Sequence, residues 1–176
     1  MVCRTRFKRF IEIGNHAIQL ANELVMDRRT KGITPGDLVV LEDAERRPLG
    51  LGTMNPLSKI AIRILDFDTE AEINEAWFVA KLTRALQHRE ILYAEPFYRL
   101  VHAESDGLPG IIIDRFGDVA VIQPNAAYAE AMIEPLVAAL ITVTGVTTVI
   151  KNGTGRARSL EGLNEEMVVV HGDAPT

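Results

Sequence analysis

Three strand-like segments separated by two turns, at residues 98–123, constrain the fold more than any other part of this sequence. The stretch reads YRLVHAESDGLPGIIIDRFGDVAVIQ. Apolar residues dominate YRLVHA, GIIID and VAVIQ, whereas Asp-Gly, Pro-Gly and Phe-Gly-Asp lie between them. Asp, Pro and Gly supply the backbone angles of tight turns at little cost. The stretch therefore predicts three short strands joined by turns.

The residues after this stretch predict a helix and two further strands. NAAYAEAMIEPLVAALITVTG, residues 125–145, is apolar at steps of four residues and begins with Asn125 as a candidate cap. Pro135 inside it should kink or divide the helix. TTVIK and EMVVVHG are expected to be strands, separated by the loop NGTGRARSLEGLNE. Such a mixture of hairpins and helices indicates an α+β domain rather than a doubly wound sheet.

A helix is predicted ahead of these strands, in INEAWFVAKLTRALQHRE. In DFDTEAE, Thr69 and Glu72 have the spacing of a capping box, and acids suit a helix N-terminus. Helix capping and solvation explain Asp66 and Asp68 better than a metal site does. The expected buried stripe consists of Ile73, Trp77, Leu82, Ala85 and Leu86. Residues 69–176 thus predict the order helix, then β-β-β-α-β-β.

The first 68 residues predict a small β-barrel. GDLVVLED, LGLGTMN and KIAIRIL are short strands broken by Gly, Pro and Asp. Gly50 and Gly52 within a strand indicate a bulge or a close approach of another backbone. The preceding segment NHAIQLANELV is expected to be a short helix, with its apolar residues inward. Those residues are Ile18, Leu20, Ala21, Leu24 and Val25.

Charge divides the sequence into a basic first part and an acidic second part. Residues 1–63 carry 11 Lys and Arg against 7 Asp and Glu, whereas residues 64–176 carry 8 against 17. This asymmetry indicates two modules with different surfaces, and chance composition explains it equally well. Basic residues around Phe7 and Phe10 suit contact with RNA phosphates and bases, and solvated charge on a small barrel explains them equally well.

Neither a membrane span nor a disulfide framework is encoded. No run approaches the roughly 18 apolar residues of a transmembrane helix, and the basic N-terminus lacks the apolar core and cleavage site of a signal peptide. Cys3 is the only cysteine, which excludes a multi-cysteine metal site. We therefore expect a cytoplasmic protein without a membrane or metal partner.

None of the candidate sites forms a complete catalytic constellation. NGTGRAR, residues 152–158, has Arg158 where a nucleotide-binding fingerprint needs a third glycine, so a flexible basic loop is favoured. Cys3 lies in a terminal segment, where a base would be poorly positioned. Glu104 and Asp106 could serve as an acid–base pair of an independent enzyme. A corner in a scaffold is the favoured interpretation of their turn-rich loop.

The order of these motifs resembles the large-subunit (23S) rRNA cytosine-C5 methyltransferases that carry an N-terminal PUA domain. The similar segments are GNHAIQLANELV, TPGDLVVLED, LGLGTMNPLSKIAIRIL, INEAWFVAKLTRALQHR, residues 98–123 and RSLEGL. They extend from about residue 8 to the end of the sequence. The family often has His-Pro-Trp where this sequence has His16, Ala17 and Ile18, so that proline and that aromatic ring are missing here.

The resemblance implies an S-adenosylmethionine-dependent class I enzyme of three domains: a PUA barrel that binds RNA, a central connector and a Rossmann-like catalytic domain. On this basis residues 1–68 are the PUA-like domain and residues 69–176 the α+β connector. The catalytic domain, with its cofactor site and its cysteine, is expected to be missing. We therefore expect no catalytic residue and no cofactor site in this chain, and no methyl transfer by it alone.

Two functions of different classes follow. The first is the RNA-binding and connector portion of such an enzyme, which positions 23S rRNA for the absent catalytic domain. Its basic residues would contact phosphates and its glycines would allow close backbone approach. The expected RNA-facing set is Arg9, His16, Arg28, Arg29, Lys31, Gly36, Gly50 and Gly52.

The second function is a protein-interaction or dimerisation scaffold that has lost RNA binding. Exposed sheet edges and the acidic second part of the sequence would favour it. The target nucleotide and the pairing of two chains into a homodimer stay open at this point.

Overall fold

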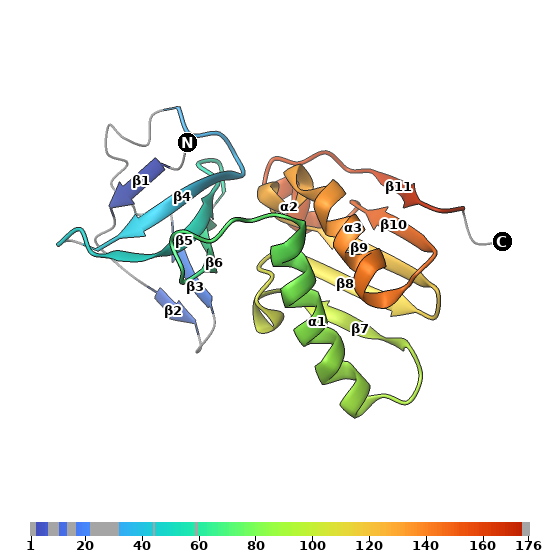
Figure 1. Ribbon diagram of the computed structural model, residues 1–176. Coiled ribbons are helices and arrows are strands. Elements are labelled where there is room, and N and C mark those ends of the chain that lie inside the picture. Colours follow the sequence, from blue (N-terminus) through green and yellow to red (C-terminus); the bar gives the residue numbers. More distant parts are fainter. Residues whose placement is uncertain are drawn as a thin grey trace.

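Two β-sheets, one on each side of an extended linker, organise the chain (Figure 1). The structure is a computed structural model and describes residues 3–6, 11–13, 17–21, 32–43, 45–58 and 60–173. Within these ranges the strands up to Asp66 form the first sheet, and the elements from Glu75 onward form the second sheet and its helices. The predicted α+β fold with an N-terminal β region is confirmed.

Six short strands form the first sheet, in the order β1-β4-β5-β6-β3-β2. β1 runs parallel to β4, and the other four pairs are antiparallel. The bounds are β1 (Cys3–Arg6), β2 (Ile11–Ile13), β3 (Ala17–Ala21), β4 (Asp37–Glu42), β5 (Pro48–Met54) and β6 (Ile60–Asp66). The strands expected in GDLVVLED, LGLGTMN and KIAIRIL are therefore confirmed.

The helix expected in NHAIQLANELV is wrong where the structure describes it, because Ala17–Ala21 is strand β3. This strand pairs antiparallel with β6, with Leu20 opposite Ile62. Ile18 and Leu20 alternate with polar or small residues, so the short segment fits a strand period as well as a helical one. Pairing with a distant strand decides between the two. Leu24 and Val25 lie outside the described residues.

Gly50 and Gly52 lie where β5 passes close to β6. The pairing of these strands shifts register between Leu51 and Gly52. A Cβ atom at Gly50 would lie 2.8 Å from the carbonyl oxygen of Asp66, and one at Gly52 would lie 2.8 Å from that of Arg63. The predicted irregularity and close backbone approach are confirmed, and the approaching backbone is that of β6.

Five strands form the second sheet, in the order β11-β10-β9-β8-β7. β9 and β10 are parallel, and the other pairs are antiparallel. The bounds are β7 (Phe97–His102), β8 (Ile111–Phe116), β9 (Val119–Pro124), β10 (Thr148–Asn152) and β11 (Met167–His171). All five predicted strands are confirmed. A helical crossover joins β9 to β10, as parallel neighbours require.

Four α-helices accompany this sheet: α1 (Glu75–Leu92), α2 (Ala127–Ala131), α3 (Ile133–Thr144) and the short α4 (Arg156–Leu160). Figure 1 shows α1 and α3 side by side on the same face of the sheet, and the two helices are in contact. A 3₁₀ helix, η2 (Ala103–Asp106), connects β7 to β8. Within the described ranges no helix is long and apolar enough to cross a membrane.

The helices begin at other residues than the sequence suggests. Asn74, rather than Thr69, caps α1, because its side-chain oxygen accepts the backbone N–H of Trp77 at 3.1 Å. The helix expected over 125–145 divides at Met132, and Ala126 rather than Asn125 precedes α2. Pro135 falls in the first turn of α3, where a missing N–H leaves no helical hydrogen bond unmade.

One apolar core extends from the second sheet into the first. Phe78 and Leu82 of α1 are fully buried in it, together with residues of β7 to β10 and α3. Val40, Leu51 and Leu65, from three strands of the first sheet, belong to the same cluster. A smaller cluster lies within the first sheet and comprises Val39, Leu41, Met54, Ala61, Ile62 and Ile64. The two sheets are therefore packed against each other.

Candidate nucleic-acid interface

The basic part of the predicted RNA-facing set falls on residues that the structure does not describe. These are Arg9, His16, Arg28, Arg29 and Lys31. Contact between these side chains and RNA stays a prediction.

The three glycines of the set lie against backbone of the protein itself. Gly36 has a φ of +97°, and a Cβ atom there would lie 3.2 Å from the carbonyl carbon of Ala127 and from the amide nitrogen of Tyr128. Gly36 therefore allows the turn before β4 to pack on α2, in the same way as Gly50 and Gly52 admit β6. Contact of the three glycines with RNA stays a prediction.

The first sheet is joined to the second domain by hydrogen bonds to the buried carboxylate of Glu161. Its oxygens accept from the side-chain amide of Asn55 at 2.8 Å, the hydroxyl of Ser58 at 2.7 Å and the guanidinium of Arg63 at 3.1 Å. Arg63 also donates to Glu104 of η2 at 3.1 Å. Charged hydrogen bonds of this kind fix orientation as well as adding stability. We conclude that they hold the two sheets in one relative position.

Glu104 and Asp106, considered above as an acid–base pair, are both engaged in ion pairs. Glu104 contacts Arg63. Asp106 accepts from the guanidinium of Arg89 at 2.6 Å and from the backbone N–H of His102 at 2.7 Å. These contacts favour the interpretation of the loop as a corner of the scaffold.

The carboxylate of Asp66, at the end of β6, contacts two side chains of α1. It accepts from the indole N–H of Trp77 at 2.8 Å and lies 3.4 Å from Nζ of Lys81. Burial alone would raise the pKa of this carboxyl, but the hydrogen bonds from Trp77 and the Asp68 amide, together with Lys81, hold the pKa below its usual value. Lys81 Nζ also lies 4.9 Å from the centre of the Trp77 ring, within range of a cation–π contact.

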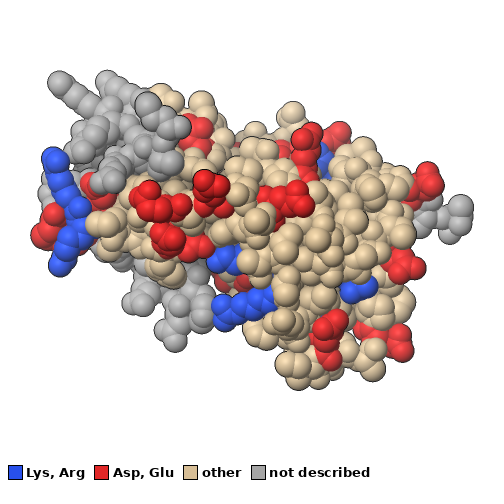
Figure 2. All heavy atoms as spheres, in the orientation of Figure 1, with Lys and Arg blue, Asp and Glu red and all other residues tan. Residues whose placement is uncertain are grey.

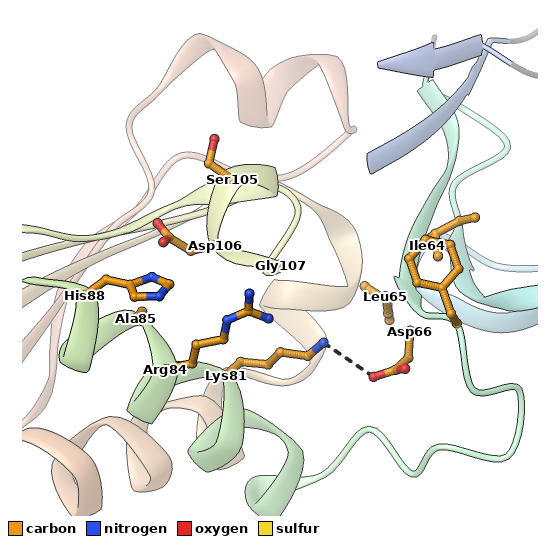
Figure 3. Close-up of a pocket in the computed structure, with 11 residues that line it drawn as sticks. Ile64, Leu65, Asp66, Lys81, Arg84, Ala85, His88, Ser105, Asp106 and Gly107 are labelled. Atoms are coloured by element: carbon orange, nitrogen blue, oxygen red, sulfur yellow. Dashed lines mark ion pairs between the residues drawn. The ribbon is translucent and has the colours of Figure 1, made fainter. Parts of the chain in front are cut away.

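A hollow of about 180 Å³ opens beside this contact (Figure 3). One wall is the end of β6, from Ile64 to Asp66, with the following residue Phe67, and the opposite wall is η2 with Gly107. Its floor is a stripe of α1 formed by Lys81, Arg84, Ala85 and His88. Their spacing of three and four residues places them on one helix face. The apolar stripe predicts the buried face of this helix, whereas the basic residues were not among the predicted site residues, although their spacing of three and four is readable in the sequence.

The loop at 152–158 does not offer room for S-adenosylmethionine. Arg158 is 2% exposed and fills the interior of this loop, so it is not part of a flexible basic loop as expected. Its guanidinium donates to the carbonyls of Pro124 and Asn164 and to the carboxylate of Glu130, at 2.6 to 2.8 Å. A Cβ atom at Gly153 would lie 2.6 Å from the carbonyl oxygen of Glu166. The described part of the chain thus does not fit this cofactor there.

Comparison with known proteins places these features in a wider class. Residues 15–67 match the PUA-like domain family. Over its whole length the chain superposes, with a TM-score of 0.74 and 14% identity, on 44% of a Streptococcus mutans protein described as a SAM-dependent methyltransferase. It superposes over 89% of its length, with a TM-score of 0.70 and 16% identity, on 39% of a protein described as a methyltransferase complexed with SAH. The fold is therefore a PUA-like domain followed by an α+β domain, as found within larger methyltransferase structures.

Sequence similarity leads to more particular relatives. The chain is 39% identical over 130 residues to ribosomal RNA large subunit methyltransferase I of Aliivibrio fischeri, covering 72% of this chain and 33% of the relative. For the proteins of the same name from Shewanella denitrificans and Photobacterium profundum, the identities are 38% and 37%, over 80% and 84% of this chain and 36% and 38% of the relatives. The chain is thus homologous to part of ribosomal RNA large subunit methyltransferase I, and it spans about a third of the length of these relatives.

Proposed function

We propose that this chain is the RNA-binding and connector part of an S-adenosylmethionine-dependent rRNA cytosine-C5 methyltransferase that acts on 23S rRNA in the cytoplasm. The observation that carries the proposal is the identity of 34% to 39%, over 72% to 84% of the chain, to proteins named ribosomal RNA large subunit methyltransferase I. A PUA-like domain at residues 15–67 supports an RNA partner.

In this proposal the first sheet binds rRNA, and the second domain fixes the position of that sheet. Arg9, His16, Arg28, Arg29 and Lys31 contact the RNA, the arginines and the lysine through phosphates, which adds affinity and makes it dependent on salt. The contacts of Glu161 with Asn55, Ser58 and Arg63 hold the described strands of the first sheet against the second domain. Binding of S-adenosylmethionine and methyl transfer take place outside the described residues.

Binding of the 176-residue chain to fragments of 23S rRNA, at about 50 and 200 mM salt, tests the proposal. We expect affinity to fall steeply with salt and to fall further when Arg28, Arg29 and Lys31 are changed to alanine together. Arg156→Ala is the matched control, since this exposed arginine lies in the second domain. Absence of binding at the lower salt, or equal loss in the control, would overturn the proposal.

A second candidate function, a protein-interaction or dimerisation scaffold, is favoured by one observation. The edge strand β11 exposes three apolar side chains, with exposed fractions of 62% for Met167, 38% for Val168 and 36% for Val170. Open edges with apolar side chains are surfaces on which further strands pair. Sedimentation that reports association in the absence of RNA, abolished by Val168→Lys, would support this candidate.

A further inference from the structure

The hollow between β6, α1 and η2 carries one positive charge that nothing in the described residues neutralises. Asp66 and Asp106 are the acids in its lining, and each already has a cationic partner, Lys81 and Arg89 respectively. Arg84 has no hydrogen bond or ion pair within the part of the chain that the structure describes. Figure 3 shows its guanidinium directed into the space between α1 and the turn at Gly107. The hollow therefore offers a cation to an anionic ligand.

Lys81 adds a second cation whose position is already fixed. The contacts with Asp66 and with the Trp77 ring hold its ammonium group in the lining of the hollow. Asp66 neutralises part of this charge. Lys81 would therefore contribute to ligand binding mainly through its fixed position and its remaining N–H donors, and less through net charge. On the face shown in Figure 2, acidic side chains are scattered and basic ones occur in only a few places. Two cations beside one hollow therefore differ from the rest of this face.

An aromatic ring borders the same hollow. Phe67 is 63% exposed and directly follows β6. An exposed phenylalanine beside two cations is the combination by which proteins hold single-stranded nucleic acids, because a base stacks on the ring while its phosphate contacts the cations. His88, on the α1 floor of the hollow, provides a further ring for hydrogen bonding or stacking.

The size of the hollow restricts the ligand. Pockets for whole drug-sized ligands or cofactors are about 300 to 1,000 Å³, whereas this hollow is about 180 Å³. It is therefore too small for a cofactor-sized ligand and admits part of one nucleotide, the rest of which would lie over the exposed ring of Phe67. A paired base could not reach that ring without leaving its stack.

We propose that this hollow holds one unpaired nucleotide of single-stranded RNA, with its base on Phe67 and its phosphate on Arg84 and Lys81. The inference rests on the proposed function, which supplies the RNA, and it adds a contact formed by β6, α1 and η2 to those of the basic residues. Because the carboxylate of Asp66 accepts a hydrogen bond from Trp77, the end of β6 is held against the helix that carries Arg84 and Lys81. The protein would thereby favour RNA that offers an unpaired nucleotide.

The test uses the full chain and a fluorescently labelled single-stranded hexauridylate, with a hairpin duplex of equal charge for comparison. Stacking on an aromatic ring predicts that Phe67→Ala weakens hexauridylate binding by about 5-fold to 150-fold. Arg84→Ala should weaken it too and lower the slope of log affinity against log salt by about 0.7, the value for one phosphate of a single strand. Phe97→Ala, which removes another ring that is 63% exposed, and Arg156→Ala should bind as the parent does.

The outcomes separate this inference from the proposed function. If Phe67→Ala and Arg84→Ala bind as the parent does while the triple variant of Arg28, Arg29 and Lys31 loses rRNA, the inference fails and the function stands. If the parent binds no RNA at all, both fail. A further outcome is that inorganic phosphate displaces the labelled RNA equally well from the parent and from Phe67→Ala. That result would show that the hollow binds an anion only, and it would overturn the proposal that it holds a nucleotide. Phe67 and Arg84 are both exposed, so their variants should keep the Trp77 fluorescence of the folded parent.

Discussion

Arg63 of β6 donates a hydrogen bond to Glu161, 3.1 Å away and 98 residues further along the chain. The bond crosses from the first sheet to the segment that follows α4. Both side chains are largely withdrawn from water, with exposed fractions of 12% for Arg63 and 4% for Glu161. A charge buried to this extent is stable only with hydrogen-bonded partners, so the loss of either one should be measurable.

Replacing Glu161 with glutamine should lower the free energy of unfolding by about 1 to 3 kcal/mol. The amide has nearly the same shape but leaves Glu104 as the only anionic partner of Arg63 among the residues that the structure describes, and charged hydrogen bonds are worth about this amount. Urea unfolding followed by circular dichroism measures the difference. Glu165→Gln, at an exposed neighbour, should stay within about 0.5 kcal/mol of the parent. An unchanged midpoint for Glu161→Gln would mean that the junction does not depend on this charge.

The stability contributed by Asp66 should depend on pH. Its carboxyl pKa is lower in the folded chain than the usual 3.8, so the folded state binds fewer protons than the unfolded state. The contribution is therefore complete above the usual value and is lost as pH falls through the lower, folded value. We expect the stability difference between the parent and Asp66→Asn to be larger at about pH 6 than at about pH 3.

Fluorescence of Trp77, the only tryptophan, reports on this carboxylate because the indole N–H binds it directly. Urea titrations at several pH values give the stability difference. A difference for Asp66→Asn that is constant from neutral to acid pH would refute the assignment of the lowered pKa.

Two glycines of similar backbone conformation should differ in their tolerance of alanine. Gly110 and Gly145 have φ values of +75° and +68°. A Cβ atom at Gly145 meets nothing within 4 Å, whereas one at Gly110 would lie 2.6 Å from Cβ of Ala126. Gly145→Ala should therefore cost only the left-handed backbone strain, about 1 to 2 kcal/mol, and Gly110→Ala should cost more. Thermal unfolding of both variants decides the order, and equal melting temperatures would contradict it.

Removal of the Arg158 side chain should destabilise the second domain strongly. Arg158→Ala leaves the carbonyls of Pro124 and Asn164 without this donor and Glu130 with Lys151 alone. Loss of one partner from a buried charged network costs about 3 to 5 kcal/mol. Arg158→Lys keeps the charge but not the fork that reaches all three acceptors, so it should restore only part of the stability. Arg156→Ala, two residues away and exposed, serves as the surface control in the same urea titration.

The parts of the fold that the sequence predicts correctly are those with a local signal. Turn-forming pairs bound the strands at 98–123, and the apolar stripe around Trp77 and Leu82 has helical spacing. β3 has no such signal, because five residues fit either period and the pairing with β6 lies some forty residues away. Asn74 caps α1 because it lies directly before the first helical turn, a position that the capping-box pattern at Thr69 missed.

The candidate sites were harder to predict for a related reason. Arg158 reads as a basic loop residue, since its partners include two backbone carbonyls that no sequence pattern identifies. The hollow near Arg84 is assembled from β6, α1 and η2, which are separate in the sequence. Only the folded chain shows that Asp66 and Asp106 are already neutralised and Arg84 is not.

The shared core makes the chain one cooperative unit. Val40, Leu51 and Leu65 are buried in the same cluster as Phe78 and Leu82, so neither half can unfold without exposing apolar surface of the other. A segment cut at the linker would present these side chains to water and tend to aggregate. Since a ligand stabilises whatever unfolds together with its site, RNA held by the first sheet would raise the melting temperature of β11 as much as that of β4. The melting temperature of the second sheet therefore reports whether RNA is bound to the first sheet.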